Sequence, residues 1–111
     1  MTALARKLES IREKASLKNA DVAQILGARP ETVSRWNQGH AYPHPSTERV
    51  LLELEYIVDQ LSDIYEPNEA RQWLFSRQKL LDGVSPASLI QEGNIERVME
   101  LVSQVRDAVY M

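Results

Sequence analysis

The sequence contains no cysteine, which excludes disulfide scaffolds, thiol catalysis and cysteine-ligated zinc. Its only two histidines, His40 and His44, lie in a proline-containing loop with no third ligand nearby, so no metal site is predicted. No apolar run approaches the ~20 residues that a membrane span needs. The N-terminal segment lacks the long apolar core of a signal peptide. We therefore expect a cytoplasmic protein with no metal, no cofactor and no membrane partner.

What the sequence does contain is an ordinary globular balance, with 43% hydrophobic and 26% charged residues over 111 positions. The net charge of −3 hides an asymmetry. Residues 1–50 hold 8 Lys or Arg against 5 Asp or Glu, whereas residues 51–111 hold 5 against 11. A basic half suits a polyanion, and an acidic half could meet a basic protein. Chance variation among solvated faces would give the same asymmetry.

Apolar residues recur at helical spacing along the chain, and no stretch alternates as a strand does. The predicted fold class is all-α. An N-terminal helix-turn-helix bundle (residues 1–45) is joined by a long central helix (residues 46–66) to a small helical part (residues 67–111). The central helix carries apolar residues on more than one narrow face, so we expect it to lie between the two halves or across a dimer interface.

Capping residues and prolines predict where the helices begin. The central helix is expected over about residues 47–65, and a short helix is expected from Pro67 to Phe75. The predicted caps are Ser46 or Thr47 for the central helix, Ser85 for a one-turn helix and Asn94 for the last helix.

Residues 17–39 have the pattern of a helix-turn-helix. Ala23 is small where two helices would cross, and Gly27 permits the positive φ of a tight turn. Val33 and Trp36 lie on the inner face of the second helix, and Trp36 is expected in the core. The polar residues left facing outward are Thr32, Ser34 and Arg35. A helix with such a face fits the DNA major groove, which is ~12 Å wide.

This segment resembles the helix-turn-helix of Xre/Cro-type repressors, whose pattern ends in a Val-Ser-Arg-Trp-like run and a glycine. The resemblance implies that side chains of this helix-turn-helix contact the base edges and phosphates of operator double-stranded DNA. The residues implied are Asn19, Arg29, Glu31, Thr32, Ser34 and Arg35. Lys18 and Arg29 stand where these repressors often carry a capping Ser or Thr, so two caps of about 1 kcal/mol each are lost. A solvated face without DNA binding is the alternative.

The C-terminal part offers nothing for catalysis, because it has no histidine, no cysteine, no glycine-rich phosphate loop and no nucleophile–base pair. We predict that the protein is not an enzyme. Its apolar anchors are expected to be Trp73, Leu74, Leu80, Leu81, Leu89, Ile90, Val98 and Leu101.

This part is similar to the toxin-binding domain of Xre/MbcA/ParS-type antitoxins, with MbcA-like members the most similar. The residues that carry the resemblance are Ala70, Arg71, Trp73, Leu74, Leu80, Gly83, Pro86, Leu89, Gly93, Val98 and Leu101. Ser76-Arg77-Gln78 departs from the Pro-Asn turn of many members. The resemblance implies a type II antitoxin with a RES-type partner toxin that consumes NAD⁺, homodimerisation, and repression of its own operon.

The chain ends in an apolar patch with a free carboxylate, whereas termini are usually polar and frayed. Either the end packs on its own core or dimer mate, or it enters the NAD⁺ cleft of the toxin, as the resemblance implies. The residues assigned to toxin binding are Trp73, Phe75, Arg106, Asp107, Val109, Tyr110 and Met111. A stand-alone repressor whose C-terminal half only dimerises is the alternative function.

Overall fold

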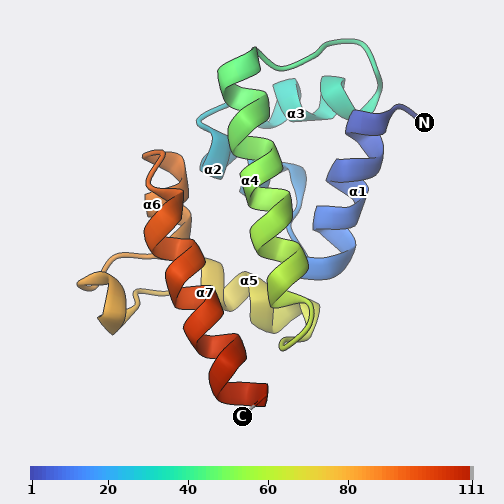
Figure 1. The fold of residues 1–111 in the computed structure, drawn as a ribbon. Helices are drawn as coiled ribbons and strands as arrows, with labels where there is room; N and C mark the ends of the chain where they lie inside the picture. Colours follow the sequence, from blue (N-terminus) through green and yellow to red (C-terminus); the bar gives the residue numbers. More distant parts are fainter. Residues whose placement is uncertain (111) are drawn as a thin grey trace.

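The computed structural model describes residues 1–110 and is drawn as a ribbon in Figure 1. In that range the chain forms seven α-helices and one short 3₁₀ helix, with no strand beyond an isolated bridge between Gln78 and Val84. The elements are α1 (Ala3–Ala15), α2 (Asn19–Leu26), α3 (Pro30–Asn37), α4 (Pro45–Leu61), α5 (Pro67–Phe75), η1 (Lys79–Leu81), α6 (Pro86–Gln91) and α7 (Ile95–Tyr110). The all-α fold class is confirmed.

Short polar caps and prolines set the beginnings of the helices. The Thr2 hydroxyl accepts a hydrogen bond from the N–H of Ala5 at 3.0 Å. The predicted cap at Ser85 is confirmed, because its hydroxyl accepts from the N–H of Ser88 at 3.2 Å. Proline occupies the first turn of α3, α4, α5 and α6, where the backbone N–H has no helical partner.

The central helix α4 begins and ends earlier than predicted. It begins at Pro45, and the ring of His44 caps it, so the predicted caps Ser46 and Thr47 are wrong. Proline suits the first helical position because it needs no partner for its nitrogen. The helix ends at Leu61. The apolar pattern continues further along the chain because the following turn packs against the same core.

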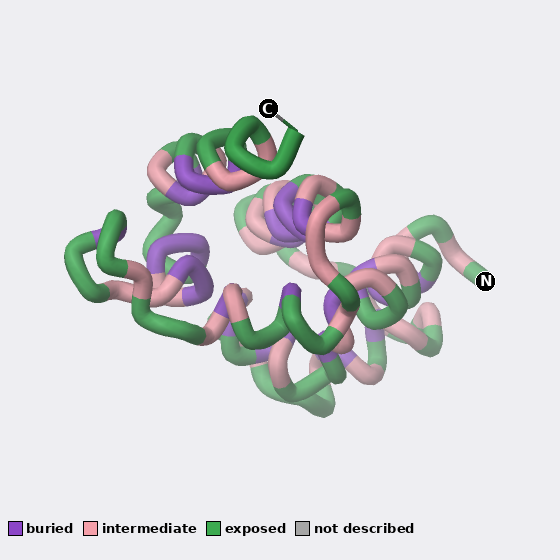
Figure 2. Tube along the Cα trace, turned by 90° about the horizontal axis from the view of Figure 1, so that it is seen from below, coloured by how far each residue is buried: buried purple, intermediate pink, exposed green. Residues whose placement is uncertain are grey.

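Helix α4 lies at the centre of the molecule and contacts helices from both ends of the chain, α1 and α2 on one side and α6 and α7 on the other. Its buried residues are Leu51, Leu54, Ile57, Val58 and Leu61. Because α1 also packs against α5, and α2 against α6, the two halves share one hydrophobic core. Figure 2 shows buried positions turned inward and exposed positions on the outer faces.

Two predictions about core residues have opposite outcomes. Trp36 is buried, at 3% exposure, as predicted. The prediction that Leu80 anchors the core is wrong, because Leu80 is 70% exposed while the adjacent Leu81 is 2% exposed. The two lie in the short turn η1, where only one of two neighbouring side chains can face the core. In residues 1–110, no helix is long and apolar enough to cross a membrane.

Candidate functional site

Helix α3 presents a polar face on the side away from the core. Val33 and Trp36 are buried, so Glu31 and Arg35, about half a turn around the helix, point outward and are exposed. Thr32 is half-buried at the edge of this face. The arrangement places two charged side chains, one helical turn apart, where a docked major groove could meet them.

A three-residue turn fixes α3 against α2. Gly27 has a φ of +70°, a conformation that favours glycine, and the N–H of Ala28 donates to the carbonyl of Ala23 at 2.9 Å. Arg29 then begins α3 as an exposed N-cap whose side chain forms no capping hydrogen bond. The cap loss expected from the sequence is present at this position.

Positive charge is left unpaired around α2 and α3. In the part of the chain that the structure describes, Arg12, Lys18, Arg29 and Arg35 take part in no ion pair. Arg12 lines both the hollow at the beginning of α2 and the hollow between α1, α2 and α3. By contrast, three of the five cations in residues 51–111 are paired with carboxylates. The unpaired cations favour a polyanion at the N-terminal surface.

Asn19, predicted to contact a DNA phosphate, is exposed at the first position of α2. Its side-chain oxygen accepts a hydrogen bond from Nδ2 of Asn37, the last residue of α3, at 3.0 Å. Ser34 is half-buried and lines the hollow beside them. Asn19 therefore holds the beginning of α2 against the end of α3, which fixes the spacing between two elements of the proposed DNA surface.

Asp21 joins the two halves of the chain, and sequence reasoning missed it. One of its carboxylate oxygens accepts from the backbone N–H of Lys18, the N-cap residue of α2, at 3.0 Å. Arg71, on α5, donates to the same carboxylate at 3.0 and 3.3 Å. This hydrogen bond raises the pKa of the Arg71 guanidinium. The three-residue spacing from Lys18 to Asp21 is half of a capping box and was a usable signal for the cap; nothing local predicts the bond to Arg71.

The aromatic residues assigned to toxin binding on α5 are only partly accessible. Trp73 and Phe75 are half-buried and pack against the core. The guanidinium of Arg71 lies 5.3 Å from the centre of the Phe75 ring, within cation–π distance. The carbonyl of Trp73 accepts from the side chain of Gln78 at 3.2 Å. The first contact involves the Phe75 ring, whereas the second ties the backbone at the end of α5 to the segment that follows it.

The end of α7 is bound to the end of α4 and to the turn that follows α4. Arg106 donates to Gln60 and, at 3.1 Å, to the carboxylate of Asp63. The Tyr110 hydroxyl donates to the backbone carbonyl of Asp63 at 2.9 Å. Asp107 is exposed, so its carboxylate lies at the surface and outside the core.

Even so, the last turn of α7 leaves apolar surface uncovered. Val109 is 57% and Tyr110 is 67% exposed. Met111, also assigned to toxin binding, lies outside the described residues. Up to residue 110 the tail thus rests on its own chain by polar contacts and keeps its apolar side chains available.

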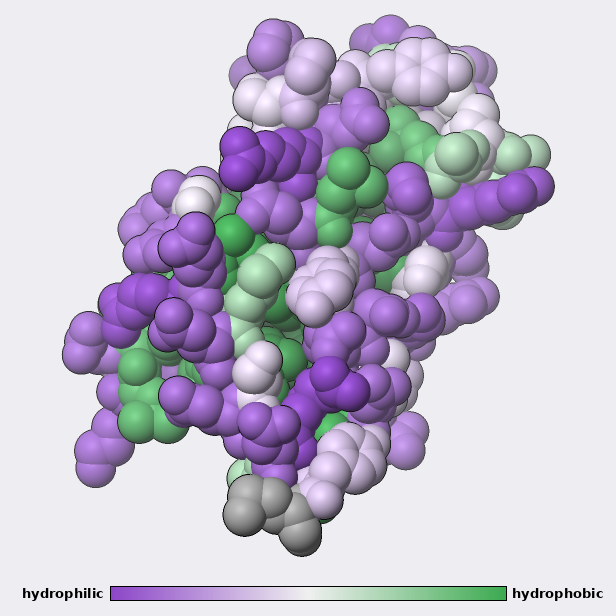
Figure 3. Space-filling model, in the orientation of Figure 1, coloured by the Kyte–Doolittle hydropathy of each residue, from purple (hydrophilic) through white to green (hydrophobic). Residues whose placement is uncertain are grey.

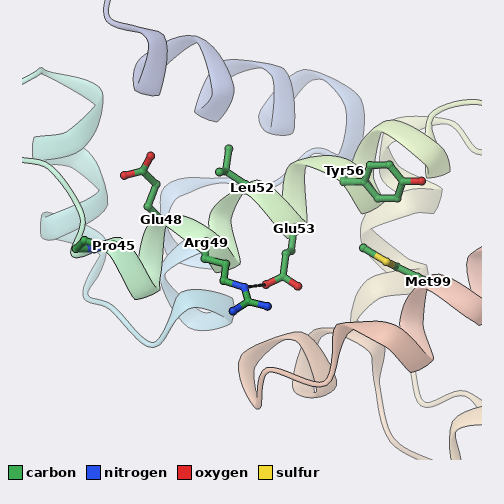
Figure 4. A pocket seen from close by; sticks show the side chains of 7 residues that line it. All are labelled: Pro45, Glu48, Arg49, Leu52, Glu53, Tyr56 and Met99. Carbon is green, nitrogen blue, oxygen red and sulfur yellow. Dashed lines mark ion pairs between the residues drawn. The ribbon is translucent and has the colours of Figure 1, made fainter.

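The described residues contain no group of three or more His, Asp or Glu side chains that could hold a metal ion. The α4 surface between α1 and α7 carries a shallow hollow lined by Leu52, Tyr56 and Met99, among others (Figure 4). The hollow is open and has no buried ionisable group. Its residues therefore suit contact with a macromolecule more than a chemical step.

Comparison with known proteins identifies relatives of this chain. No family model matches the sequence. The mycobacterial cidal antitoxin MbcA of Mycobacterium tuberculosis is 31% identical over 108 residues, which span 97% of this chain and 96% of MbcA. A probable mycobacterial cidal antitoxin of the same organism is 30% identical over 91 residues, 82% of this chain and 77% of its own length. The crystal structure of the M. tuberculosis MbcT–MbcA toxin–antitoxin complex contains a chain that matches with a TM-score of 0.86, 30% identity and full coverage of both chains.

The fold and these likenesses define the class as an all-helical antitoxin of a toxin–antitoxin system. The chain belongs to the family of the mycobacterial cidal antitoxin MbcA. Both of these relatives are named as antitoxins.

Proposed function

We propose that this antitoxin neutralises a RES-type toxin that degrades NAD⁺, and that it represses its own operon as a cytoplasmic homodimer. The observation that carries the proposal is the full-length likeness to MbcA, whose crystal structure was determined in complex with the toxin MbcT. The RES class of the toxin and its use of NAD⁺ come from the family resemblance of the sequence. The likeness extends over the whole chain, so it includes the C-terminal helix.

In the proposed mechanism the end of α7 blocks the NAD⁺ cleft of the toxin. The exposed Val109 and Tyr110 supply apolar surface for the cleft, and Tyr110 stacks where part of the dinucleotide would lie. Asp107 meets an arginine that otherwise holds an NAD⁺ phosphate. The antitoxin thereby excludes substrate by volume and charge, without chemistry of its own.

The second activity is DNA binding through α3 and the beginning of α2. The unpaired cations around these helices and the outward-facing Arg35 support it. Phosphate contacts would release counterions, so binding should weaken steeply with salt. Repression of the operon follows if the operator overlaps the promoter.

Removal of the last five residues tests the inhibitory mechanism. A chain that lacks residues 107–111 keeps Arg106 and its contacts with Gln60 and Asp63, so α7 should stay in place. We expect this truncated chain to leave NAD⁺ consumption by the co-purified toxin uninhibited, while its circular dichroism and operator binding remain those of the full chain. Gln104→Ala, on the exposed side of the same helix, is the matched control and should inhibit normally. Full inhibition by the truncated chain would refute the blocking mechanism.

A further inference from the structure

The outer face of α4 carries a continuous exposed stripe that the proposed functions do not use. It faces away from the buried side of α4 and runs between α1 and α7 (Figures 1 and 4). The exposed residues of this stripe are Pro45, Glu48, Arg49, Leu52, Tyr56 and Asp59. Figure 3 shows this face of the molecule, where hydrophobic residues lie as islands within a mainly hydrophilic surface.

The middle of the stripe is apolar. Leu52 is 41% and Tyr56 is 52% exposed, and they lie one helical turn apart. Hollows lie on both sides of this ridge, one reaching Met99 on α7 and the other reaching Lys14 on α1. The exposed pair and the hollows beside it give a second protein apolar surface to bury and space for its side chains.

The charges at the two ends of the stripe complement each other. Glu48 and Arg49 lie before the apolar centre, and Asp59 lies after it. Asp59 is paired with Lys14 of α1 at 2.6 Å, and this hydrogen bond raises the pKa of Lys14. Each end therefore presents one acid and one base.

We infer that this stripe is the surface on which two copies of the chain associate, antiparallel about a two-fold axis midway between Leu52 and Tyr56. An isologous contact pairs residue i with residue j and j with i. In this register Leu52 of one copy lies opposite Tyr56 of the other. Arg49 then lies level with Asp59 of the second copy, and Glu48 lies near the Lys14 that accompanies it. The inference rests on the homodimer of the proposed function and names its interface.

Like charges do not prevent this register. Glu53 and Glu55 flank the apolar centre. In this register Glu53 of one copy lies level with Glu55 of the other. Each already has a cation in its own chain, since Arg49 lies 3.8 Å from Glu53 and Lys7 lies 3.8 Å from Glu55. Because the two-fold axis creates every contact twice, the favourable contacts at the two ends act together.

A charge-reversal cycle on the full chain tests the inference. Arg49 and Asp59 are ten residues apart, or about 15 Å along α4, too far to couple within one chain. R49D places two acids opposite the Asp59–Lys14 pair, and D59R places two bases opposite Glu48 and Arg49. We expect each single variant to raise the dimer dissociation constant about tenfold in sedimentation equilibrium. The double variant R49D/D59R places two acids opposite two bases and should bind at least as tightly as the unaltered chain.

Two further variants complete the experiment. L52E should make the chain monomeric with unchanged circular dichroism, because Leu52 is already 41% exposed in a single chain. R77D, on an exposed cation outside the stripe, should leave the dimer unaffected. A monomeric unaltered chain would refute both the dimer and this interface. A dimer that tolerates the single reversals and L52E, or that the double variant fails to restore, would refute the interface alone. Toxin inhibition is read separately with the truncated chain.

Discussion

At the residue scale, Asp21 has a structural role that its local sequence only partly suggests. Its carboxylate completes the beginning of α2 by accepting from the N–H of Lys18 and also holds Arg71 of α5. The carboxylate side chain is 13% exposed, whereas that of Arg71 is 45% exposed. The capping bond is therefore expected to contribute more stability than the ion pair, which water screens on one side.

Substitution of Asp21 separates these two contributions. Asp21→Ala removes both and should lower the free energy of unfolding by about 1–2 kcal/mol in urea titration. Asp21→Asn keeps an oxygen that can accept from Lys18 and should lose under ~1 kcal/mol. Glu13→Ala, which removes an exposed carboxylate of α1, is the control and should change little. Equal losses for the alanine and asparagine variants would mean that the ion pair dominates.

At the scale of elements, α3 depends on its neighbours for its position. It has 8 residues, too few to form a stable helix alone in water. Burial of Val33 and Trp36, the turn at Gly27 and the Asn19–Asn37 hydrogen bond hold it in place. None of these contacts uses the outer face of α3, which therefore remains available to DNA.

Two charge deletions on that outer face should have opposite effects. Arg35→Ala should weaken operator binding about tenfold or more in gel retardation, because an arginine contact to guanine contributes ~1–3 kcal/mol. Glu31→Ala, one turn away, removes an acid that repels phosphate and should strengthen binding to unrelated duplexes. Both residues are exposed, so stability should not change in either variant. Unaltered operator affinity in Arg35→Ala would indicate that α3 does not read DNA.

At the scale of the whole molecule, one core joins the part proposed to bind DNA to the part proposed to bind toxin. Helix α4 contacts α1 and α2 as well as α6 and α7, and α1 packs against α5. With no boundary between two cores, we expect the chain to unfold as one cooperative unit.

The two tryptophans of the sequence make this prediction measurable, because Trp36 lies in α3 and Trp73 in α5. Trp73→Phe leaves only Trp36 as a fluorescent reporter, and Trp36→Phe leaves only Trp73. In each variant the fluorescence transition in urea should coincide with the transition followed by far-ultraviolet circular dichroism. A Trp73 signal that changes at lower urea than the circular dichroism would show that the C-terminal part unfolds independently.

Local patterns of residues were enough to predict the individual helices. Helical spacing of apolar residues predicted the all-α class, and prolines or short polar residues marked some helix beginnings, as at Pro67 and Ser85. Gly27, Val33 and Trp36 indicated the turn and the inner face of α3, since each acts within a few residues. The family resemblance stated from the residues was also correct.

Contacts between residues far apart in the chain became visible in the folded molecule alone. Arg71 reaches Asp21 across 50 residues, and Arg106 reaches Asp63 across 43. Such bonds have no local periodicity, because they depend on how whole helices pack. For the same reason the sequence placed Leu80 in the core and did not single out Leu52 and Tyr56 as exposed. Periodicity shows that a helix has an apolar face, but the helices that pack around it determine how much of that face stays in contact with water.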